Sequence, residues 1–441
     1  MKNCIFTICA KNYIGLAQVL EKSIKKTNPE CLFYIFVADE LPDIDTLEVP
    51  KNVFECRKVL KDFINEDKWN EMSFKYNLTE FCTSIKPFCF EYLFKKLNFD
   101  KSIFLDPDIF VFSSFNSVFS ELDRFKIILT PHIITFNANY KGDRSEKGIL
   151  STGVFNLGFL ALRKSEEVDK MLSWWGVRLK MQCYIDVLDS YFTDQRWMDF
   201  LPCFFDASTL SVSHHLGLNV APWNFFEREI YNNNGSWYVR IRREININED
   251  FYKNHKTDHI PLIFVHFSGY DYKNLILGKV VQNNIPDLAE YIDIDNICIL
   301  YSEFLQAEKE TFNSYIKFPY TYNSYSNGIQ ITHFQRRIFR SLADEGEFFP
   351  SPFSINSGSF YAQLSKKKIL IKSTQNNVDG LNKLNMPNSN SKLKKINWLM
   401  RIIFKLIGIK NYSLLIRLLR PYSRIENQIH LLNSKYGEKL K

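Results

Sequence analysis

Short apolar runs alternate with helix-like spacing over the first 130 residues of the chain. Between the first two runs, Ile14, Ala17 and Ile24 recur at helical spacing, which predicts a helix over 13–26. Continuous apolar strands separated by helices are typical of a parallel sheet that is covered on both faces. We therefore expect a Rossmann-like α/β fold with a doubly wound, mostly parallel sheet. The apolar runs that predict its strands are 4–10, 32–38, 53–59, 102–112 and 126–131.

Two common phosphate-binding motifs are missing from this pattern. No GxGxxG follows the first apolar run, and no GxxxxGK[ST] occurs in the chain. The sequence thus lacks a dinucleotide fingerprint and a P-loop. Ligands of doubly wound sheets bind at the carboxyl ends of the strands, so we look for chemistry there.

The run 102–112 contains the pair Asp106 and Asp108 inside otherwise apolar sequence. Burying either carboxylate without a partner would cost several kcal/mol. In extended backbone, residues two apart share one face, and Pro107 favours a strand end because it has no N–H. Paired carboxylates suit Mg²⁺ or Mn²⁺. The alternative is a turn in which the two side chains cap backbone amides.

Five segments follow one another in an order that resembles a known enzyme family. In this order they resemble retaining glycosyltransferases of the GT-A fold, both family 8 and a related set of bacterial surface-polysaccharide glycosyltransferases. Residues 85–87, 194–197 and 221–224 favour the bacterial set, and the resemblance covers roughly residues 4–273. The five segments are 10–13, 105–108, 155–159, 193–197 and 265–269.

The resemblance implies a catalytic role or a metal contact at specific positions. Asp106, Asp108 and His266 match the protein ligands of a divalent cation, Mn²⁺ or Mg²⁺. Asp194 and Gln195 match residues that flank the reacting sugar carbon.

The resemblance also implies a set of contacts to the nucleotide-sugar donor. Residues 10–13 match the loop that holds the base and ribose. Lys86 matches a phosphate or sugar contact, and Asn156 and Gly158 match contacts to the donor sugar. In the family, a lysine after the His-x-x-Gly motif is followed by Pro-Trp. Lys273 is not followed by Pro-Trp, so it departs from the family pattern. The set is Ala10, Lys11, Asn12, Tyr13, Lys86, Asp106, Asn156, Gly158, Gly269 and Lys273.

Several of these residues have a structural alternative when each is taken alone. His266 ends an apolar run and could be a hydrogen-bonded core residue. Asn156 could bond the backbone at a strand bulge, and Asp194 could cap a helix. The segments at Trp174 and Trp223 could stack on acceptor sugars or pack in the core.

Charge is distributed unevenly along the 441 residues. The net charge is +7, but residues 392–441 alone carry +10, so the rest of the chain carries −3. A mildly acidic body argues against nucleic acid as a partner. The nine cysteines show no CxxC spacing, which favours reduced thiols over a zinc site.

The sequence divides into four predicted regions. We expect a GT-A domain over 1–270, an appended, mostly helical subdomain over 271–373 and an Asn/Ser-rich linker over 374–391. Basic amphipathic helices are expected over 392–441, where apolar residues recur at helical spacing among lysines and arginines. Such a helix suits an anionic lipid surface, or it packs on the protein as an ordinary helix.

Together these features predict an enzyme that transfers a sugar from a nucleotide-sugar to a glycan or lipid-linked acceptor. The resemblance implies that the donor is a UDP-sugar and that the enzyme acts in bacterial surface polysaccharide biosynthesis. We expect it in the cytoplasm, where it would sit peripherally on the inner face of the cell membrane, because no secretory leader or membrane-spanning run is seen. A nucleotidyltransferase acting on sugar phosphates and a catalytically silent glycan-binding scaffold are the alternatives.

Overall fold

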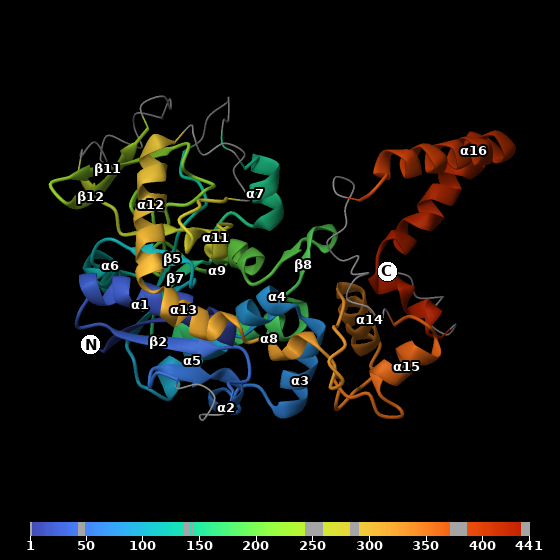
Figure 1. Cartoon of the computed structure of the whole chain (residues 1–441), viewed down its shortest axis with the longest axis horizontal. Helices are drawn as coiled ribbons and strands as arrows, with labels where there is room; N and C mark the ends of the chain where they lie inside the picture. Colours follow the sequence, from blue (N-terminus) through green and yellow to red (C-terminus); the bar gives the residue numbers. More distant parts are fainter. Residues whose placement is uncertain are drawn as a thin grey trace. The chain divides into compact units, whose positions relative to one another are not determined.

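The computed structural model describes residues 2–42, 49–135, 142, 144–242, 259–282, 291–370 and 386–433. The chain forms two compact units (Figure 1). The first consists of Met1–Asn65 and Leu78–Tyr320, and the second of Glu66–Asn77 and Thr321–Lys441. This division differs from the boundary expected at 270, because helices α12 (Ile292–Ala307) and α13 (Lys309–Ile316) pack on α1 (Ile14–Thr27) of the sheet unit.

A seven-stranded sheet forms the centre of the first unit, with strand order β10-β6-β7-β4-β1-β2-β3. Strand β7 runs antiparallel to both of its neighbours, and the other pairs are parallel. The predicted α/β fold with a mostly parallel sheet is therefore confirmed. The strands are β1 (Asn3–Cys9), β2 (Leu32–Val37), β3 (Val53–Glu55), β4 (Lys101–Leu105), β6 (Ile127–Leu129), β7 (Phe159–Arg163) and β10 (Leu210–Val212).

Helices cover both faces of this sheet. Ile5 and Ile103 belong to a buried cluster with apolar residues of α1 (Ile14–Thr27) and α6 (Asn116–Arg124). On the opposite face, the ring of Phe6 packs edge-on against Phe104 and against Phe90 of α5 (Lys86–Lys95). Alternate residues of a strand point to opposite faces, so a continuous apolar run marks a strand buried on both sides.

Two of the predicted strands end earlier than their apolar runs. The run 53–59 forms β3 and then turns into helix α2 (Cys56–Val59). The run 102–112 is divided into β4 and β5 (Ile109–Val111). Strand β5 leaves the large sheet and pairs antiparallel with β14 (Phe264–His266).

The remaining elements of the first unit surround this core. They are the helices α4 (Leu78–Ser84), α7 (Glu146–Thr152), α8 (Glu166–Gln182), α9 (Leu201–Phe204), α11 (Tyr272–Leu275), α12 (Ile292–Ala307) and α13 (Lys309–Ile316), the 3-10 helices η1 (Lys11–Tyr13), η2 (Val187–Asp189) and η3 (Gln195–Phe200), and the strands β8 (Ile185–Asp186), β9 (Tyr191–Phe192), β11 (Arg228–Asn233), β12 (Ser236–Ile241) and β13 (Ile260–Pro261).

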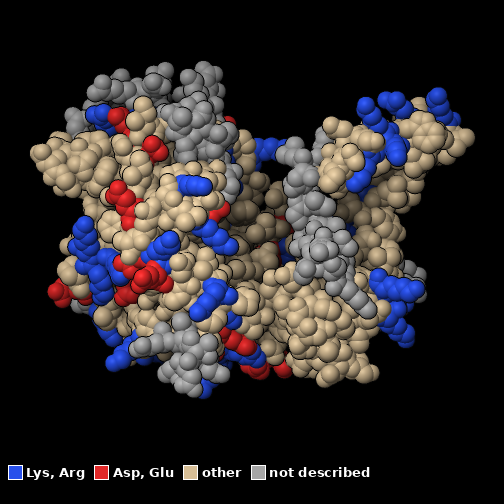
Figure 2. All heavy atoms as spheres, in the orientation of Figure 1, with Lys and Arg blue, Asp and Glu red and all other residues tan. Residues whose placement is uncertain are grey.

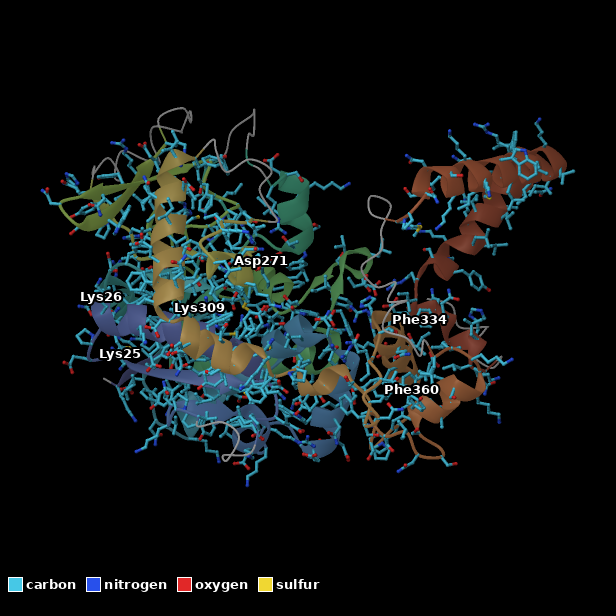
Figure 3. The ribbon with its side chains drawn as sticks, viewed as in Figure 1. Lys25, Lys26, Asp271, Lys309, Phe334 and Phe360 are labelled. Carbon is cyan, nitrogen blue, oxygen red and sulfur yellow. The ribbon has the colours of Figure 1, made fainter. Side chains whose placement is uncertain are left out.

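The second unit is helical and has its own aromatic core. The ring of Phe74 lies 4.6 Å from that of Phe339 and 5.5 Å from that of Phe360. Phe360 is fully buried, and Phe334 packs against the same cluster (Figure 3). The helices are α3 (Glu66–Lys75), α14 (His333–Asp344), α15 (Phe360–Lys366) and α16 (Ser389–Leu419), with the 3-10 helices η5 (Thr321–Asn323), η7 (Arg420–Ser423) and η8 (Glu426–Leu431).

The predicted C-terminal helical region is confirmed. Residues 374–385 of the expected linker lie outside the described residues, and its last three residues already belong to α16. Helix α16 buries none of its side chains and is kinked at Gly408, where φ is 73°. Among the described residues, no helix combines the length and hydropathy needed to cross a membrane.

Candidate metal centre

Asp106 and Asp108 lie in a turn between β4 and β5, not in one extended strand. The N–H of Ile109 donates to the carbonyl of Asp106 at 3.2 Å, and the N–H of Asp106 donates to the carbonyl of Gly158 at 2.9 Å. The expectation of a shared strand face is wrong, because the chain turns at Pro107 to pass from the large sheet to the β5–β14 ribbon. The turn nevertheless keeps both carboxylates at the carboxyl end of β4.

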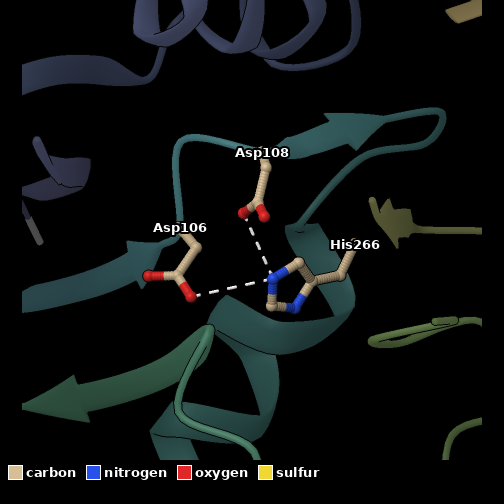
Figure 4. A group of neighbouring side chains, drawn as sticks. All are labelled: Asp106, Asp108 and His266. Carbon is tan, nitrogen blue, oxygen red and sulfur yellow. Dashed lines mark ion pairs between the residues drawn. The ribbon is translucent and has the colours of Figure 1, made fainter. Parts of the chain in front are cut away.

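His266 joins the two carboxylates through strand pairing. It lies opposite Ile109 in the β5–β14 ribbon. Its Nε2 lies 3.1 Å from Oδ1 of Asp108 and 3.7 Å from Oδ2 of Asp106 (Figure 4). One ligand atom from each residue falls within 4.8 Å of the other two. Ligands at right angles on a small divalent cation lie about 3 Å apart, so this set fits such an ion.

Asn219 orients the imidazole ring. Its Nδ2 donates to Oγ1 of Thr130 at 2.9 Å and to Oδ1 of Asn156 at 3.0 Å. Both amide hydrogens are therefore used, and the Oδ1 of Asn219 faces Nδ1 of His266 at 3.3 Å. An acceptor at Nδ1 places a ring proton there, so Nε2 is the atom that would ligate a cation once it is deprotonated. Asn219 was not among the residues predicted from the sequence.

Gly158 makes room for this ring. A Cβ built on Gly158 would lie 2.3 Å from Cε1 and 2.6 Å from Nδ1 of His266. The ring of Trp223 packs edge-on against the imidazole, with centroids 5.2 Å apart. His266 is thus enclosed by packing as well as by hydrogen bonds.

The three ionisable groups shift one another's pKa values. Desolvation raises the pKa of Asp106 to about 6, although the charges of Lys86 and His266 oppose this shift. Burial alone would raise the pKa of Asp108, but His266 and a hydrogen bond from Tyr272 lower it overall. Burial alone would lower the pKa of His266, but the two carboxylates raise it. Such mutual shifts are typical of functional sites.

A buried ion pair joins two other predicted residues. The Nζ of Lys86 lies 2.6 Å from Oδ2 of Asp194 and donates to the carbonyl of Leu157 at 2.8 Å. Both charged side chains are almost fully buried. In this structure Lys86 is therefore occupied by Asp194 and by backbone, while its charge still acts on Asp106.

Gln195 and Asn156 form a hydrogen-bonded chain that reaches the metal centre. The Oε1 of Gln195 accepts from the N–H of Leu157 at 3.2 Å and from Nδ2 of Asn156 at 3.4 Å. The Oδ1 of Asn156 accepts from Asn219 and from the N–H of Gly158 at 3.0 Å. Asn156 therefore bonds local backbone, as its structural alternative predicts, and also holds Asn219, the hydrogen-bond partner of His266.

The loop 10–13 borders the same sheet edge. Strands β1 and β4 are parallel neighbours, so the segment after Cys9 and Asp106 lie at one edge. Lys11 lies 3.5 Å from buried Asp39, which follows the next strand. The ring of Tyr13 packs edge-on against that of Tyr272. Ala10, directly after β1, is buried. The Oδ1 of Asn12 is buried without a hydrogen-bond partner among the described residues.

The segment after His266 contributes one residue that the sequence analysis missed. The hydroxyl of Tyr272 donates to Oδ2 of Asp108 at 3.0 Å. Gly269 has φ of 80°, which favours glycine. Asp271 (Figure 3) caps α11 by accepting from the N–H of Lys273. The side chain of Lys273 is exposed, outside the described cluster of Asp106, Asp108 and His266.

Comparisons with known proteins place this chain near two curated proteins of Bacillus subtilis (strain 168). The chain is 23% identical to the uncharacterized protein YfnF over 275 residues, which is 61% of this chain and 82% of YfnF. It is 26% identical to the uncharacterized protein YfnD over 194 residues, which is 43% of this chain and 54% of YfnD. No protein-family model matches the chain.

Solved structures with a similar chain trace include three glycosyltransferases. The galactosyltransferase LgtC, solved with donor and acceptor sugar analogs, has a TM-score of 0.36 and 16% identity over 72% of this chain and 97% of LgtC. GlyE of Streptococcus pneumoniae TIGR4 has a TM-score of 0.36 and 13% identity over 74% of this chain and 67% of GlyE. The bifunctional glycosyltransferase WbbM has a TM-score of 0.37 and 15% identity over 72% of this chain and 52% of WbbM.

Proposed function

We propose that this chain is a metal-dependent glycosyltransferase. It transfers a sugar, with retention, from a nucleotide-sugar donor, a UDP-sugar, to a glycan or lipid-linked acceptor of a bacterial surface polysaccharide. The observation that carries the proposal is the cluster of Asp106, Asp108 and His266 beside the loop 10–13. Two carboxylates and an imidazole suit Mn²⁺, or Mg²⁺, and the sheet edge is where α/β folds bind nucleotides.

The chemistry follows from charge. A divalent cation at this centre would neutralise the negative charge that develops on a departing diphosphate. Asp106 and Asp108 would hold it, and Asn219 would keep Nε2 of His266 pointed at it. The positive charge that develops at the sugar carbon requires a nearby carboxylate or amide oxygen. Asp194 and Gln195 remain the proposed residues for that role, with Lys86 fixing the carboxylate of Asp194.

Isothermal titration of UDP into the full chain, with and without Mn²⁺, tests the proposal. We expect binding that depends on Mn²⁺ and that Asp108→Ala abolishes. Glu166→Ala is the matched control, because it removes an exposed carboxylate from α8. UDP binding that is equal with and without Mn²⁺, or that survives Asp108→Ala, would refute the metal assignment.

The same titration separates the two alternatives. A nucleotidyltransferase acting on sugar phosphates would prefer UTP over UDP. A glycan-binding scaffold would show no metal-dependent nucleotide binding. A donor-hydrolysis screen over common nucleotide sugars then identifies the sugar.

We also propose that α16 attaches the chain peripherally to an anionic membrane surface. For a cytoplasmic enzyme with a lipid-linked acceptor, this surface would be the inner face of the cell membrane. Leu406 and Ile409 are 78% and 69% exposed. Lysines and arginines gather on this helix in the face drawn in Figure 2. Apolar side chains interleaved with cations suit anionic headgroups.

Deleting residues 392–441 would be a poor test, because Ile429 and Leu432 belong to the core of the second unit. Leu406→Ser combined with Ile409→Ser leaves that core intact. We expect this variant to lose flotation with vesicles of phosphatidylglycerol, while Leu188→Ser, at an equally exposed site of the sheet unit, retains it. Flotation of the double variant at the wild-type level would remove the proposal.

A further inference from the structure

Four aromatic rings on either side of Gln195 in the sequence form a stacked series. Tyr191, Trp197, Phe200 and Phe204 stack in turn, with centroids 6.0, 6.5 and 5.9 Å apart. The successive planes differ by 29°, 26° and 14°. Ordinary aromatic cores favour edge-on and offset pairs in mixed orientations, so a run of near-parallel rings is a distinct feature of this surface.

Trp174 packs against the ring series, and two of the four rings are exposed to solvent. The ring of Trp174 packs edge-on against Phe204 at 5.2 Å and against Trp197 at 6.1 Å. Phe200 and Phe204 are 50% and 51% exposed. Rigid aromatic side chains that remain exposed in a cluster mark binding surfaces.

A cavity of about 400 Å³ opens beside the rings. This volume suits a small ligand. Its wall combines the aromatic faces with carboxylate, hydroxyl and guanidinium groups. The wall includes Asp189, Ser190, Tyr191, Arg196, Trp197 and Phe200.

Hydrogen bonds tie the wall of this cavity to the segment that precedes Asn156. Arg196 and Asp199 form an ion pair, and Oδ1 of Asp199 accepts from the N–H of Val154 at 3.0 Å. The neighbouring Gln195 donates to the carbonyl of Thr152 at 2.8 Å. The segment so anchored leads to Asn156 and Gly158, which position His266. The cavity thus adjoins the segment that carries the proposed donor chemistry.

We propose that this cavity binds a pyranose ring of the acceptor glycan. The inference deepens the proposed glycosyltransferase function and rests on it. One face of a pyranose presents weakly positive C–H bonds, which match the electron-rich aromatic side chains of this wall, with Tyr191 at one end of the stacked series. Its hydroxyls match the carboxylate of Asp189 and the guanidinium of Arg196. A prenyl chain has no hydroxyl for these groups, and it is the other occupant that the test below distinguishes.

Titration of the full-length protein with glycan probes, followed by tryptophan fluorescence and calorimetry, tests the assignment. The probes are maltotriose, cellotriose and triacetylchitotriose, with geranyl phosphate as the prenyl comparison. We expect at least one glycan to bind and to change the fluorescence. Phe200→Ala should weaken that glycan about tenfold, since it removes roughly one aromatic contact.

Further variants separate a lost contact from a lost fold. Trp197→Phe keeps a flat ring and should retain most of the affinity that Trp197→Ala loses. Trp237→Ala, on β12, should leave glycan binding unchanged. Every variant should bind UDP and Mn²⁺ as the wild type does.

The outcomes distinguish this inference from the proposed function. Wild-type protein that binds UDP and Mn²⁺ but none of the three glycans overturns the glycan site alone. Binding of geranyl phosphate that Phe200→Ala weakens, without glycan binding, overturns the ligand class. Absence of metal-dependent UDP binding overturns the proposed function, whatever the glycans do.

Discussion

Replacing Gly158 by alanine should disable the metal centre although none of the three proposed ligand residues is replaced. The added Cβ would lie 2.3 Å from Cε1 of His266. Ordinary carbon–carbon contact is about 3.5–4.0 Å, so the ring must retreat by roughly 1.2 Å or more. Metal–ligand distances tolerate only about 0.2 Å. The ring cannot swing freely, because Asn219 and Trp223 hold it.

We expect Gly158→Ala to lower Mn²⁺ affinity about 10- to 100-fold, the range typical of lost ligand positioning. The overpacking should also cost about 1–3 kcal/mol of unfolding free energy. Calorimetry with Mn²⁺ measures the first effect, and urea denaturation in EDTA measures the second. Gly148→Ala is the control, because its Cβ would meet no described atom closer than 3.4 Å.

A double-variant cycle identifies the source of the strain. In a His266→Ala background the imidazole is gone, but Oδ1 of Asn156 still lies 2.9 Å from the added Cβ, so Gly158→Ala should cost less unfolding free energy than in the wild-type background without becoming neutral. An equal loss in both backgrounds would show that His266 is not the obstacle. Mn²⁺ affinity of Gly158→Ala at the wild-type level would refute the reasoning outright.

Three further predictions concern the same site. Asn219→Ala should weaken Mn²⁺ binding about 10- to 100-fold in calorimetry, because the imidazole loses its orienting acceptor. Mn²⁺ affinity should fall as the pH drops from about 7.5 to 5.5, because Asp106, with a pKa of about 6, and His266, with a raised pKa, must both be deprotonated to ligate; a pH-independent affinity contradicts this. Lys86→Met should lower stability in urea by about 3–5 kcal/mol by leaving Asp194 buried and unpaired, and adding Asp194→Asn should recover part of it.

Much of the sheet could be predicted because its strands are marked by uninterrupted apolar runs. The two carboxylates of the metal cluster could be named because Asp106 and Asp108 stand out from apolar sequence, whereas His266 could be named only because its segment resembles a family motif. Their local geometry could not, since a turn and a strand end look alike in so short a motif. Likewise the run 53–59 is too short for its periodicity to separate strand from helix.

Residues that act through contacts distant in the sequence could not be predicted, because no local sequence pattern identifies them. Asn219 lies among apolar neighbours, and its partners Asn156 and His266 are remote in the sequence. Tyr272 is one of many tyrosines, and only the β5–β14 pairing brings it to Asp108. The packing of Ile429 in the second unit was equally hidden, because helical spacing predicts an apolar face and not its partner.

The β5–β14 ribbon brings one half of the candidate centre from early in the chain and the other half from far downstream. An ion seated there would tie these distant stretches together and would bind the folded chain only. Such binding adds about 2.7 kcal/mol to folding when the free ion is a hundredfold above its dissociation constant. Cation supply in the cell would then govern how long each molecule survives, and not only how fast it turns over.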